Sequence, residues 1–483
     1  MAIVINKPDL KVKQIKTHSL SAYSYIIESD KEVAVIDPLR DVKPYTDFIH
    51  DTHSKCKWVL STQYHSDFVS GCCDLASKAH AKLMFGPDSH PEFNCRVGHN
   101  NDSITVGNHI ITLLHTPGHT VESTCYLLSD GEKKPIAIFT GDTLYLGDVG
   151  RPDTVQIAST TTVASMAKYL FKSLKVLQGL PDDVMVLPGH GSGFGWAKTI
   201  AVGDRSTIGE QRQSNKLFTE ADEQTFISAV TEDLPHYPAY FSLVTHINKH
   251  GNMKSIDDVV NSSFKAFTAE KFKELAEDPH SFIIDCRFPG NFVQGAIPGS
   301  ISIPIDVQFG IWTANVIDPR KGDKILLVAP EGREREAINN LARTGLDNVV
   351  GFLEGGYENW VSHHFPVEKL DNQEFATKED FAKATEGAKV LDVRSYSDWK
   401  TGVLKSATLI NLANVRAAAE SSKDKAAKIF IHSKKTGGRS VLAASLLKRL
   451  GFTNVHHIAG GVDALKLKGV EFVAATQTSA ETF

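Results

Sequence analysis

Residues 59–71, Val-Leu-Ser-Thr-Gln-Tyr-His-Ser-Asp-Phe-Val-Ser-Gly, decide the fold of the first half of this chain. An apolar run that ends at Leu60 gives way abruptly to a polar cluster in which His65 and Asp67 stand two residues apart. This pattern is typical of a buried strand that delivers side chains to a site at its end. The stretch therefore predicts a strand followed by a functional loop.

The same design recurs three times further along the chain. Each copy is an apolar run that ends in a His or an Asp beside a glycine: Leu-Leu-His-Thr-Pro-Gly-His-Thr at 113–120, Ile-Phe-Thr-Gly-Asp-Thr-Leu at 138–144, and Val-Leu-Pro-Gly-His-Gly at 186–191. Imidazole and carboxylate ligands together suit Zn, Fe or Mn. The four strand ends therefore predict a metal site.

The order of these motifs resembles the metallo-β-lactamase superfamily. The segment Gly-Asp-Val-Gly-Arg-Pro-Asp at 147–153, which follows the third motif, is similar to its persulfide dioxygenase branch. The resemblance implies an α/β fold, a metallo-β-lactamase-like αββα sandwich of two sheets flanked by helices. It also implies oxidation of glutathione persulfide to sulfite by Fe2+ and oxygen.

The resemblance implies iron ligands at positions 63, 119 and 142, two histidines and a carboxylate that leave coordination positions open. His119 and Asp142 match the family, but the first histidine is replaced by Gln63. The oxygen of an amide is a neutral and weaker ligand than imidazole, and loss of a ligand should cost more than the ~10–100-fold typical of its supporting residues. We therefore expect weak or no iron binding here. In the family, an aspartate at the position of Asp37 supports the metal loops.

Four residues that can bind metal remain: His65, Asp67, Asp142 and His190. In zinc members of the superfamily such residues build a second metal position, which leaves open a single shifted ion, such as Zn, and a mononuclear metal hydrolase. Phe68 stands where zinc hydrolases usually have another histidine, which disfavours a dinuclear site. A site without metal is also open, because the carboxylates can accept hydrogen bonds from the histidines.

Arg151 follows the third motif and has two interpretations. In an active enzyme it would contact an anionic substrate. The alternative is an ion pair with Asp148 or Asp153.

The second half of the chain contains an internal repeat. Residues 282–287 resemble residues 390–394, and residues 345–356 resemble residues 451–461. This spacing suits a duplicated α/β domain. The two units resemble rhodanese domains, whose active loop wraps backbone N–H groups around a cysteine that carries a persulfide sulfur.

Neither unit has a cysteine in that loop. Ala329 stands at its position in the first unit and Ser433 in the second. A serine hydroxyl cannot carry a persulfide, so we expect no sulfurtransfer. Gly437, Gly438 and Arg439 remain in the second loop and predict weak binding of sulfate-sized anions, the alternative being a tight strand-to-helix turn that needs no ligand.

Composition is that of a soluble globular protein, with 41% apolar and 23% charged residues among 483. A formal net charge of −5 gives no basic field for nucleic acid or an anionic membrane, and no run reaches the ~18 apolar residues that a membrane helix needs. Six cysteines in so long a chain form no disulfide framework. The N-terminus lacks the charged region and apolar core of a secretory signal.

We expect a cytoplasmic location, with a mitochondrial one left open.

The sequence therefore predicts three domains: a metallo-β-lactamase-like domain with a helical extension at 10–255, and rhodanese-like domains at 256–368 and 372–474. We expect a protein related to persulfide oxidation that is catalytically impaired and acts in binding or structure. The alternatives are an active iron-dependent persulfide dioxygenase and a mononuclear hydrolase. The partners of an active enzyme would be glutathione persulfide or other small sulfur anions, and self-association is left open.

Overall fold

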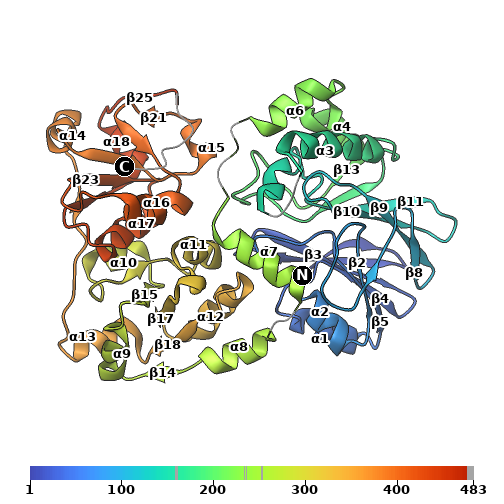
Figure 1. Ribbon diagram of the computed structural model, residues 1–483, viewed down its shortest axis with the longest axis horizontal. Helices are drawn as coiled ribbons and strands as arrows, with labels where there is room; N and C mark the ends of the chain where they lie inside the picture. Colours follow the sequence, from blue (N-terminus) through green and yellow to red (C-terminus); the bar gives the residue numbers. More distant parts are fainter. Residues whose placement is uncertain (158–160, 233, 235–236, 252–253, 476–483) are drawn as a thin grey trace. The chain divides into compact units, whose positions relative to one another are not determined.

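The computed structural model describes residues 1–157, 161–232, 234, 237–251 and 254–475. They form two compact units (Figure 1), the first taking in residues up to 234 and 241–256, the second the remainder. The finer domain boundaries at 10–255, 256–368 and 372–474 stay predictions.

The first unit is a sandwich of two sheets, which confirms the predicted fold class. One sheet has the strand order β1-β2-β3-β4-β5-β6-β7, and the other the order β13-β12-β11-β10-β9-β8. The strands are β1 (Ala2–Asn6), β2 (Lys11–Thr17), β3 (Ala22–Ser29), β4 (Glu32–Ile36), β5 (Lys55–Leu60), β6 (Lys82–Phe85), β7 (Arg96–Val97), β8 (Ser103–Val106), β9 (His109–His115), β10 (Thr124–Ser129), β11 (Pro135–Gly141), β12 (Met185–Pro188) and β13 (Ser206–Thr207). Tyr25, Trp58 and Phe139 belong to the apolar core that joins the two sheets.

Helices cover the outer faces of this sandwich. The apolar faces of α1 (Lys43–Asp51) and α2 (Cys72–Lys78) pack against the first sheet. On the second sheet lies α3 (Val163–Gln178), whose buried side chains form an apolar stripe that includes Met166, Ala167, Leu170, Leu174 and Leu177. The Thr162 hydroxyl caps α3 by accepting a hydrogen bond from the Ser165 N–H, which satisfies one of the free donors at a helix start.

Short helices follow the sandwich, as the predicted helical extension requires. They are α4 (Ile208–Ser214), α5 (Lys216–Thr219), α6 (Glu223–Thr231) and α7 (Tyr240–His250), whereas η1 (Pro152–Ile157) lies within the sandwich, between β11 and α3. Residues 233, 235–236 and 252–253 of the predicted extension lie outside the described residues. Within the described part of the chain, every helix is too short or too polar to cross a membrane.

The second unit contains two five-stranded parallel sheets, one for each copy of the repeat. The first has the order β14-β18-β17-β15-β16 and the second β19-β24-β23-β20-β22. The strands are β14 (Ala266–Phe267), β15 (Ser281–Asp285), β16 (Ile301–Ser302), β17 (Lys324–Val328), β18 (Val349–Leu353), β19 (Asn372–Gln373), β20 (Lys389–Asp392), β22 (Ala407–Leu409), β23 (Ile429–His432) and β24 (Val455–Ile458), with β21 (Val403–Leu404) and β25 (Phe472–Val473) paired apart. The identical strand order confirms the duplication.

Helices connect these parallel strands, as parallel pairing requires. In the first copy they are α8 (Ile256–Ser263), α9 (Ala269–Ala276), α10 (Pro289–Gln294), α11 (Phe309–Val316), η2 (Pro319–Lys321), α12 (Glu334–Arg343) and α13 (Gly356–Ser362). In the second they are α14 (Lys378–Thr385), α15 (Tyr396–Trp399), α16 (Leu412–Ser421), α17 (Gly438–Arg449) and α18 (Gly461–Leu467).

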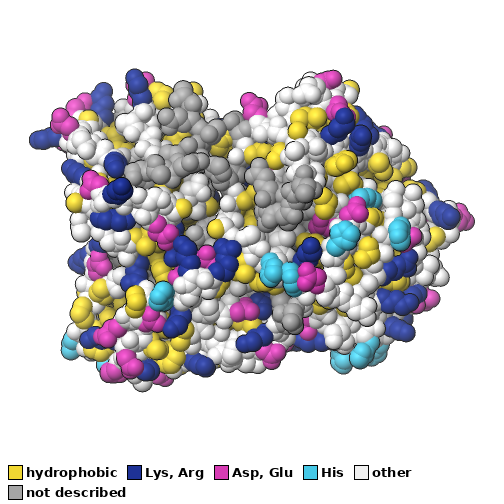
Figure 2. Space-filling model, in the orientation of Figure 1, with side chains coloured by type: hydrophobic (Ala, Val, Ile, Leu, Met, Phe, Trp, Pro, Cys, Tyr) yellow, Lys and Arg dark blue, Asp and Glu magenta, His cyan; other side chains and the backbone are white. Residues whose placement is uncertain are grey.

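A buried ion pair marks the same strand end in both copies. Arg287 pairs with Asp285 at 2.7 Å, and Arg394 pairs with Asp392 at 2.6 Å. Basic and acidic side chains are mixed over the visible face of the molecule (Figure 2), as a net charge of only −5 leads one to expect.

Candidate metal centre

Four loops meet at one end of the sandwich, and each follows a strand. Residues 61–68 follow β5, residues 116–119 follow β9, Asp142 follows β11 and His190 follows β12. The four sequence motifs therefore lie together, because the strands that precede them end at the same edge.

Asp37 holds the first of these loops. Its two carboxylate oxygens accept hydrogen bonds from the Thr62 N–H at 2.8 Å and the Thr62 hydroxyl at 2.7 Å. The backbone of Asp37 has a φ of 50°, an uncommon conformation for a residue other than glycine. These contacts fix the turn that carries Gln63 and His65.

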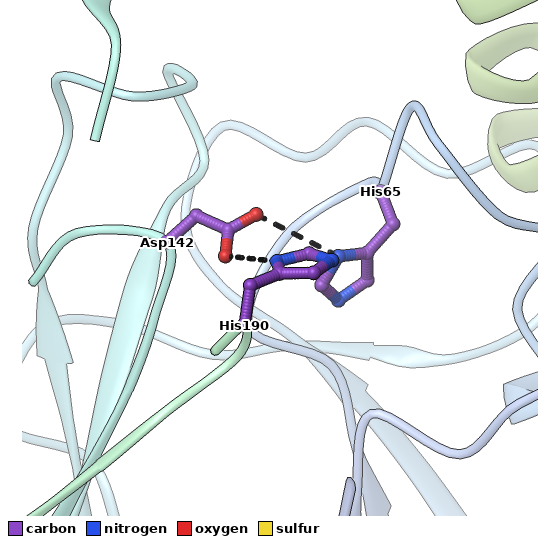
Figure 3. Close-up of side chains that lie close together, drawn as sticks. All are labelled: His65, Asp142 and His190. Carbon is purple, nitrogen blue, oxygen red and sulfur yellow. Dashed lines mark hydrogen bonds and ion pairs between the residues drawn. The ribbon is translucent and has the colours of Figure 1, made fainter. Parts of the chain in front are cut away.

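His65, Asp142 and His190 form the core of the site (Figure 3). Each offers a ligand atom, and these atoms all lie within 4.8 Å of one another. The three side chains are buried. His190 lies between two carboxylates, with its Nδ1 2.6 Å from Asp142 Oδ1 and its Nε2 3.0 Å from Asp67 Oδ2.

Gln63 uses its side chain differently from a metal ligand. Its amide nitrogen donates to Asp142 Oδ2 at 2.7 Å, so two members of the predicted iron triad are bonded to each other. The third member, His119, donates from Nδ1 to the Arg151 carbonyl at 2.9 Å and holds Nε2 3.7 Å from Asp142 Oδ2.

Neighbouring carboxylates control the charge of the histidines. Burial works against the protonated form of His190, but Asp142 and Asp67 outweigh it and raise its pKa to about 10. At His65 burial is likewise outweighed, by Asp37, Asp142 and Asp67, so its pKa is raised. Burial lowers the pKa of His119. Binding of a metal through His65 and His190 would therefore release protons.

Two phenylalanine rings stack on the site histidines. Phe68 lies on His65 with ring centroids 4.3 Å apart, and Phe194 lies on His190 at 3.9 Å. Phe68 thus covers one face of the His65 ring with an apolar ring. The centre is enclosed by apolar surface on both sides.

Arg151 is engaged by an acidic neighbour. Its Nε and Nη2 contact the two carboxylate oxygens of Asp153 at 3.0 and 2.5 Å, and both side chains are buried. The structure therefore shows the ion-pair alternative of the sequence analysis. A substrate contact at Arg151 stays a prediction.

The rhodanese loops occupy corresponding places in their sheets. Val328 pairs with Asp285 in the first copy and His432 pairs with Asp392 in the second, so Ala329 and Ser433 begin equivalent loops. Gly437 has a φ of 69°, and α17 begins at Gly438. The anion-binding role of these glycines stays a prediction.

Arg439, the third residue of the predicted anion site, already has an acidic partner. Its Nη1 lies 3.3 Å from Asp398 Oδ2, and Lys434 Nζ lies 2.6 Å from the other oxygen of the same carboxylate. A bound anion would therefore compete with Asp398 for both cations.

Asn248, which no sequence motif marks, connects α7 to the site. The amide nitrogen of Asn248 donates to the carbonyls of His65 at 2.7 Å and Phe68 at 2.9 Å, and its oxygen accepts from the Ser70 N–H at 2.8 Å. Nothing in the sequence marks Asn248, because it lies in a polar helix distant along the chain.

His65 provides the test of whether a metal fits. Among the described residues, neither ring nitrogen of His65 makes a hydrogen bond, although both are buried. Its nearest acceptors are Asp37 Oδ1, 3.4 Å from Nε2, and Asp142 Oδ2, 3.9 Å from Nδ1. The expected metal-free network thus forms around His190 and Gln63 and reaches His65 only through these longer contacts. A buried imidazole without a hydrogen bond is costly, and a metal ion held by His65, Asp142 and His190 would give it a closer partner. The residues present therefore fit a metal cofactor.

Comparison with known proteins gives two kinds of relatives. A model of the rhodanese-like domain matches residues 268–363 and 377–468. In the first half, the protein named "Probable polyketide biosynthesis zinc-dependent hydrolase BaeB" of Bacillus velezensis is 31% identical over 193 residues, 38% of this chain and 80% of that protein. A hydroxyacylglutathione hydrolase of Actinobacillus pleuropneumoniae is 26% identical over 168 residues, 35% of this chain and 65% of that protein.

Solved structures extend the likeness over more of the chain. A metallo-β-lactamase from Staphylococcus aureus is 29% identical with a TM-score of 0.63, and the match covers 71% of this chain and 99% of that one. ETHE1 from Myxococcus xanthus is 25% identical with a TM-score of 0.43, covering 50% of this chain and 99% of that one.

Proposed function

The chain belongs to the metallo-β-lactamase superfamily and carries two rhodanese-like domains, and we propose that it is a persulfide dioxygenase relative that has lost turnover and acts as a metal-holding binding protein of sulfur metabolism. Its ligands would be glutathione persulfide or other small sulfur anions. The family supports a metal cofactor, and we propose that the ion is held by His65, Asp142 and His190 rather than by Gln63, His119 and Asp142.

The bond from Gln63 to Asp142 carries this proposal. A 2.7 Å hydrogen bond in a buried site commits the amide nitrogen to the carboxylate that an iron ion would need. The buried imidazole of His65, which makes no hydrogen bond among the described residues, supports the alternative set of ligands. When bound, the ion would act as a Lewis acid and cross-link three loops.

Metal binding distinguishes the two sets of ligands. We expect one equivalent of Zn2+ to raise the unfolding midpoint of metal-free protein, because an ion that binds only the folded state stabilises it by about 2.7 kcal/mol at a hundredfold excess over Kd. That corresponds to roughly 5–10 °C for a domain of this size. Calorimetric titration and thermal unfolding with and without chelator measure both quantities.

His65→Gln and His119→Gln are the matched pair for this experiment. Both remove one buried imidazole, but only the first removes a proposed ligand. We expect His65→Gln to abolish the metal-induced shift and His119→Gln to keep it. The reverse result would move the ion to the family's triad and contradict the proposal.

The rhodanese-like domains should perform no sulfurtransfer. Ala329 has no side-chain nucleophile and Ser433 has only a hydroxyl, so no residue at these positions can hold a persulfide. We expect no thiocyanate from thiosulfate and cyanide above the rate without protein. The variant Cys286→Ala removes the one cysteine of the two rhodanese-like domains. If this variant still formed thiocyanate in a protein-dependent reaction, a loop without cysteine would transfer sulfur and the expectation would be wrong.

A mononuclear hydrolase is the second candidate. It is favoured by the convergence of His65, Asp142 and His190, with Asp67 bonded to His190, and by the sequence relationship to a zinc-dependent hydrolase. Zn2+-dependent hydrolysis of S-acylglutathione thioesters that disappears in His65→Gln would select this candidate.

All six cysteines are free thiols, and Cys56, Cys72, Cys125 and Cys286 are buried. Free thiols suit a reducing compartment. We therefore propose that the protein works in the cytoplasm.

A further inference from the structure

A chain of hydrogen bonds runs from the loop of the second rhodanese-like domain to the edge of its sheet. Ser433 Oγ lies 2.9 Å from Ser440 Oγ, and Ser440 Oγ lies 3.0 Å from His457 Nε2. His457 Nδ1 lies 2.7 Å from Asn372 Oδ1. Ser433, Ser440 and His457 are all buried. Ser440, at the start of α17, thereby links the loop to His457 of β24, which in turn contacts Asn372 of β19.

The direction of these bonds is set by Asn372. Its amide oxygen can only accept, so His457 carries its proton on Nδ1 and leaves Nε2 free to accept from the Ser440 hydroxyl. Ser440 can then accept from the Ser433 hydroxyl. Burial lowers the pKa of His457 to about 4, which keeps the imidazole neutral at pH 7 and leaves the lone pair on Nε2 available as an acceptor. The Gly437 carbonyl, 3.0 Å from Ser440 Oγ, is the alternative acceptor.

The first rhodanese-like domain shows that the fold does not require this chain. Asn372 pairs with His457 in the second sheet, and the equivalent pair in the first sheet is Ala266 with Phe352. Ala329 occupies the position of Ser433. Three polar positions in one copy are therefore apolar in the other, although the strand order is the same.

The backbone around Ser433 makes room for this arrangement. A Cβ atom at Gly437 would lie 3.2 Å from His457 Nε2, and one at Gly461 would lie 2.1 Å from the Ser433 carbonyl oxygen. The Ser440 N–H faces Ser433 Oγ at 3.4 Å. The first N–H groups of a helix have no acceptor within the helix, and such groups suit the negative charge that develops on an attacked carbonyl.

We propose that Ser433 is the nucleophile of an acyl-transfer site that accepts small carboxylic esters and thioesters. Ser440 and His457 carry its proton away, and Asn372 is a positioning residue that orients the His457 ring. The exposed Lys434 and Lys435 beside Ser433 favour acyl compounds that bear an anionic group. This inference is independent of the metal centre.

The reaction needs no reactant beyond the ester and water. Ser433 Oγ attacks the acyl carbon while its proton passes to Ser440 Oγ and the Ser440 proton passes to His457 Nε2. The bond from the acyl carbon to the alcohol or thiol then breaks, and the leaving group takes the proton back through the same chain. Water releases the acyl group from Ser433 by the same steps.

A fluorophosphonate probe tests the nucleophile on the full-length protein, with peptide mapping by mass spectrometry. We expect the probe on Ser433 and a burst of nitrophenolate from p-nitrophenyl acetate. Ser433→Ala should abolish both, and His457→Gln should slow labelling by ~100-fold, the usual scale of a lost general base. Ser445→Ala, a buried serine of the same helix, should change neither.

The pH profile separates proton transfer from a merely structural role. We expect labelling of the wild-type protein to be flat from pH 6 to 8, because His457 stays neutral there. In His457→Gln the residual rate should rise with pH, since hydroxide must then replace the imidazole. Absence of probe from Ser433 in the wild-type protein, or undiminished labelling of folded His457→Gln, would overturn the proposal.

Discussion

Gln63→His should raise the iron content of the protein well above that of the wild-type protein, to nearly one equivalent. The substitution completes two histidines and one carboxylate with His119 and Asp142, and it removes the amide that now donates to Asp142 Oδ2. Restoring an imidazole ligand should increase affinity by more than the ~10–100-fold that supporting residues contribute. Elemental analysis after expression in iron-rich medium measures the change.

The double variant Gln63→His/His119→Gln is the control for this experiment. It supplies the new imidazole but removes a second ligand, so its iron content should return to the wild-type value. Iron that stays low in the single variant would mean that residues 61–68 no longer present position 63 to a metal.

His190→Ala should destabilise the metal-free protein by about 3–5 kcal/mol, the cost of leaving buried charges without their partner. The Asp142 and Asp67 carboxylates would both lose the imidazole that contacts them at 2.6 and 3.0 Å. Neither carboxylate can reach water, because both are buried. Denaturant unfolding in the presence of chelator gives the free energy of unfolding directly.

His190→Gln separates charge from hydrogen bonding. The amide can still donate to one carboxylate, so the loss of stability should be smaller than in His190→Ala. An equal and small loss in both variants would show that the two aspartates are protonated in the folded protein. The role of His190 as their partner would then be wrong.

The sandwich and the duplicated domains were predictable because their signals lie in contiguous stretches of sequence. Each apolar run before a site loop is a strand, and the repeated segments at 282–287 and 390–394 each hold a buried ion pair. Turns and strand ends are marked by glycine, proline and polar residues, so their positions could be predicted without knowledge of the fold.

The details of the sites could not be predicted in this way. Three contacts join residues far apart in the chain. They are the hydrogen bond from Gln63 to Asp142, the stacking of Phe194 on His190, and the hydrogen bond from Asn248 to the His65 carbonyl. The chain from Ser433 to Asn372 likewise depends on the pairing of β19 with β24. A single sequence names such residues only as polar, because their partners are set by tertiary packing.

The most direct test of the central claim measures oxygen consumption with glutathione persulfide as substrate. The protein is first loaded with Fe2+ under anaerobic conditions, and oxygen is then added. The loss of an imidazole at position 63 predicts no consumption above that of free iron, while Gln63→His measured in parallel shows what the restored triad can do. Sustained oxygen uptake by the wild-type protein, with one sulfite formed per persulfide, would contradict the claim that turnover has been lost.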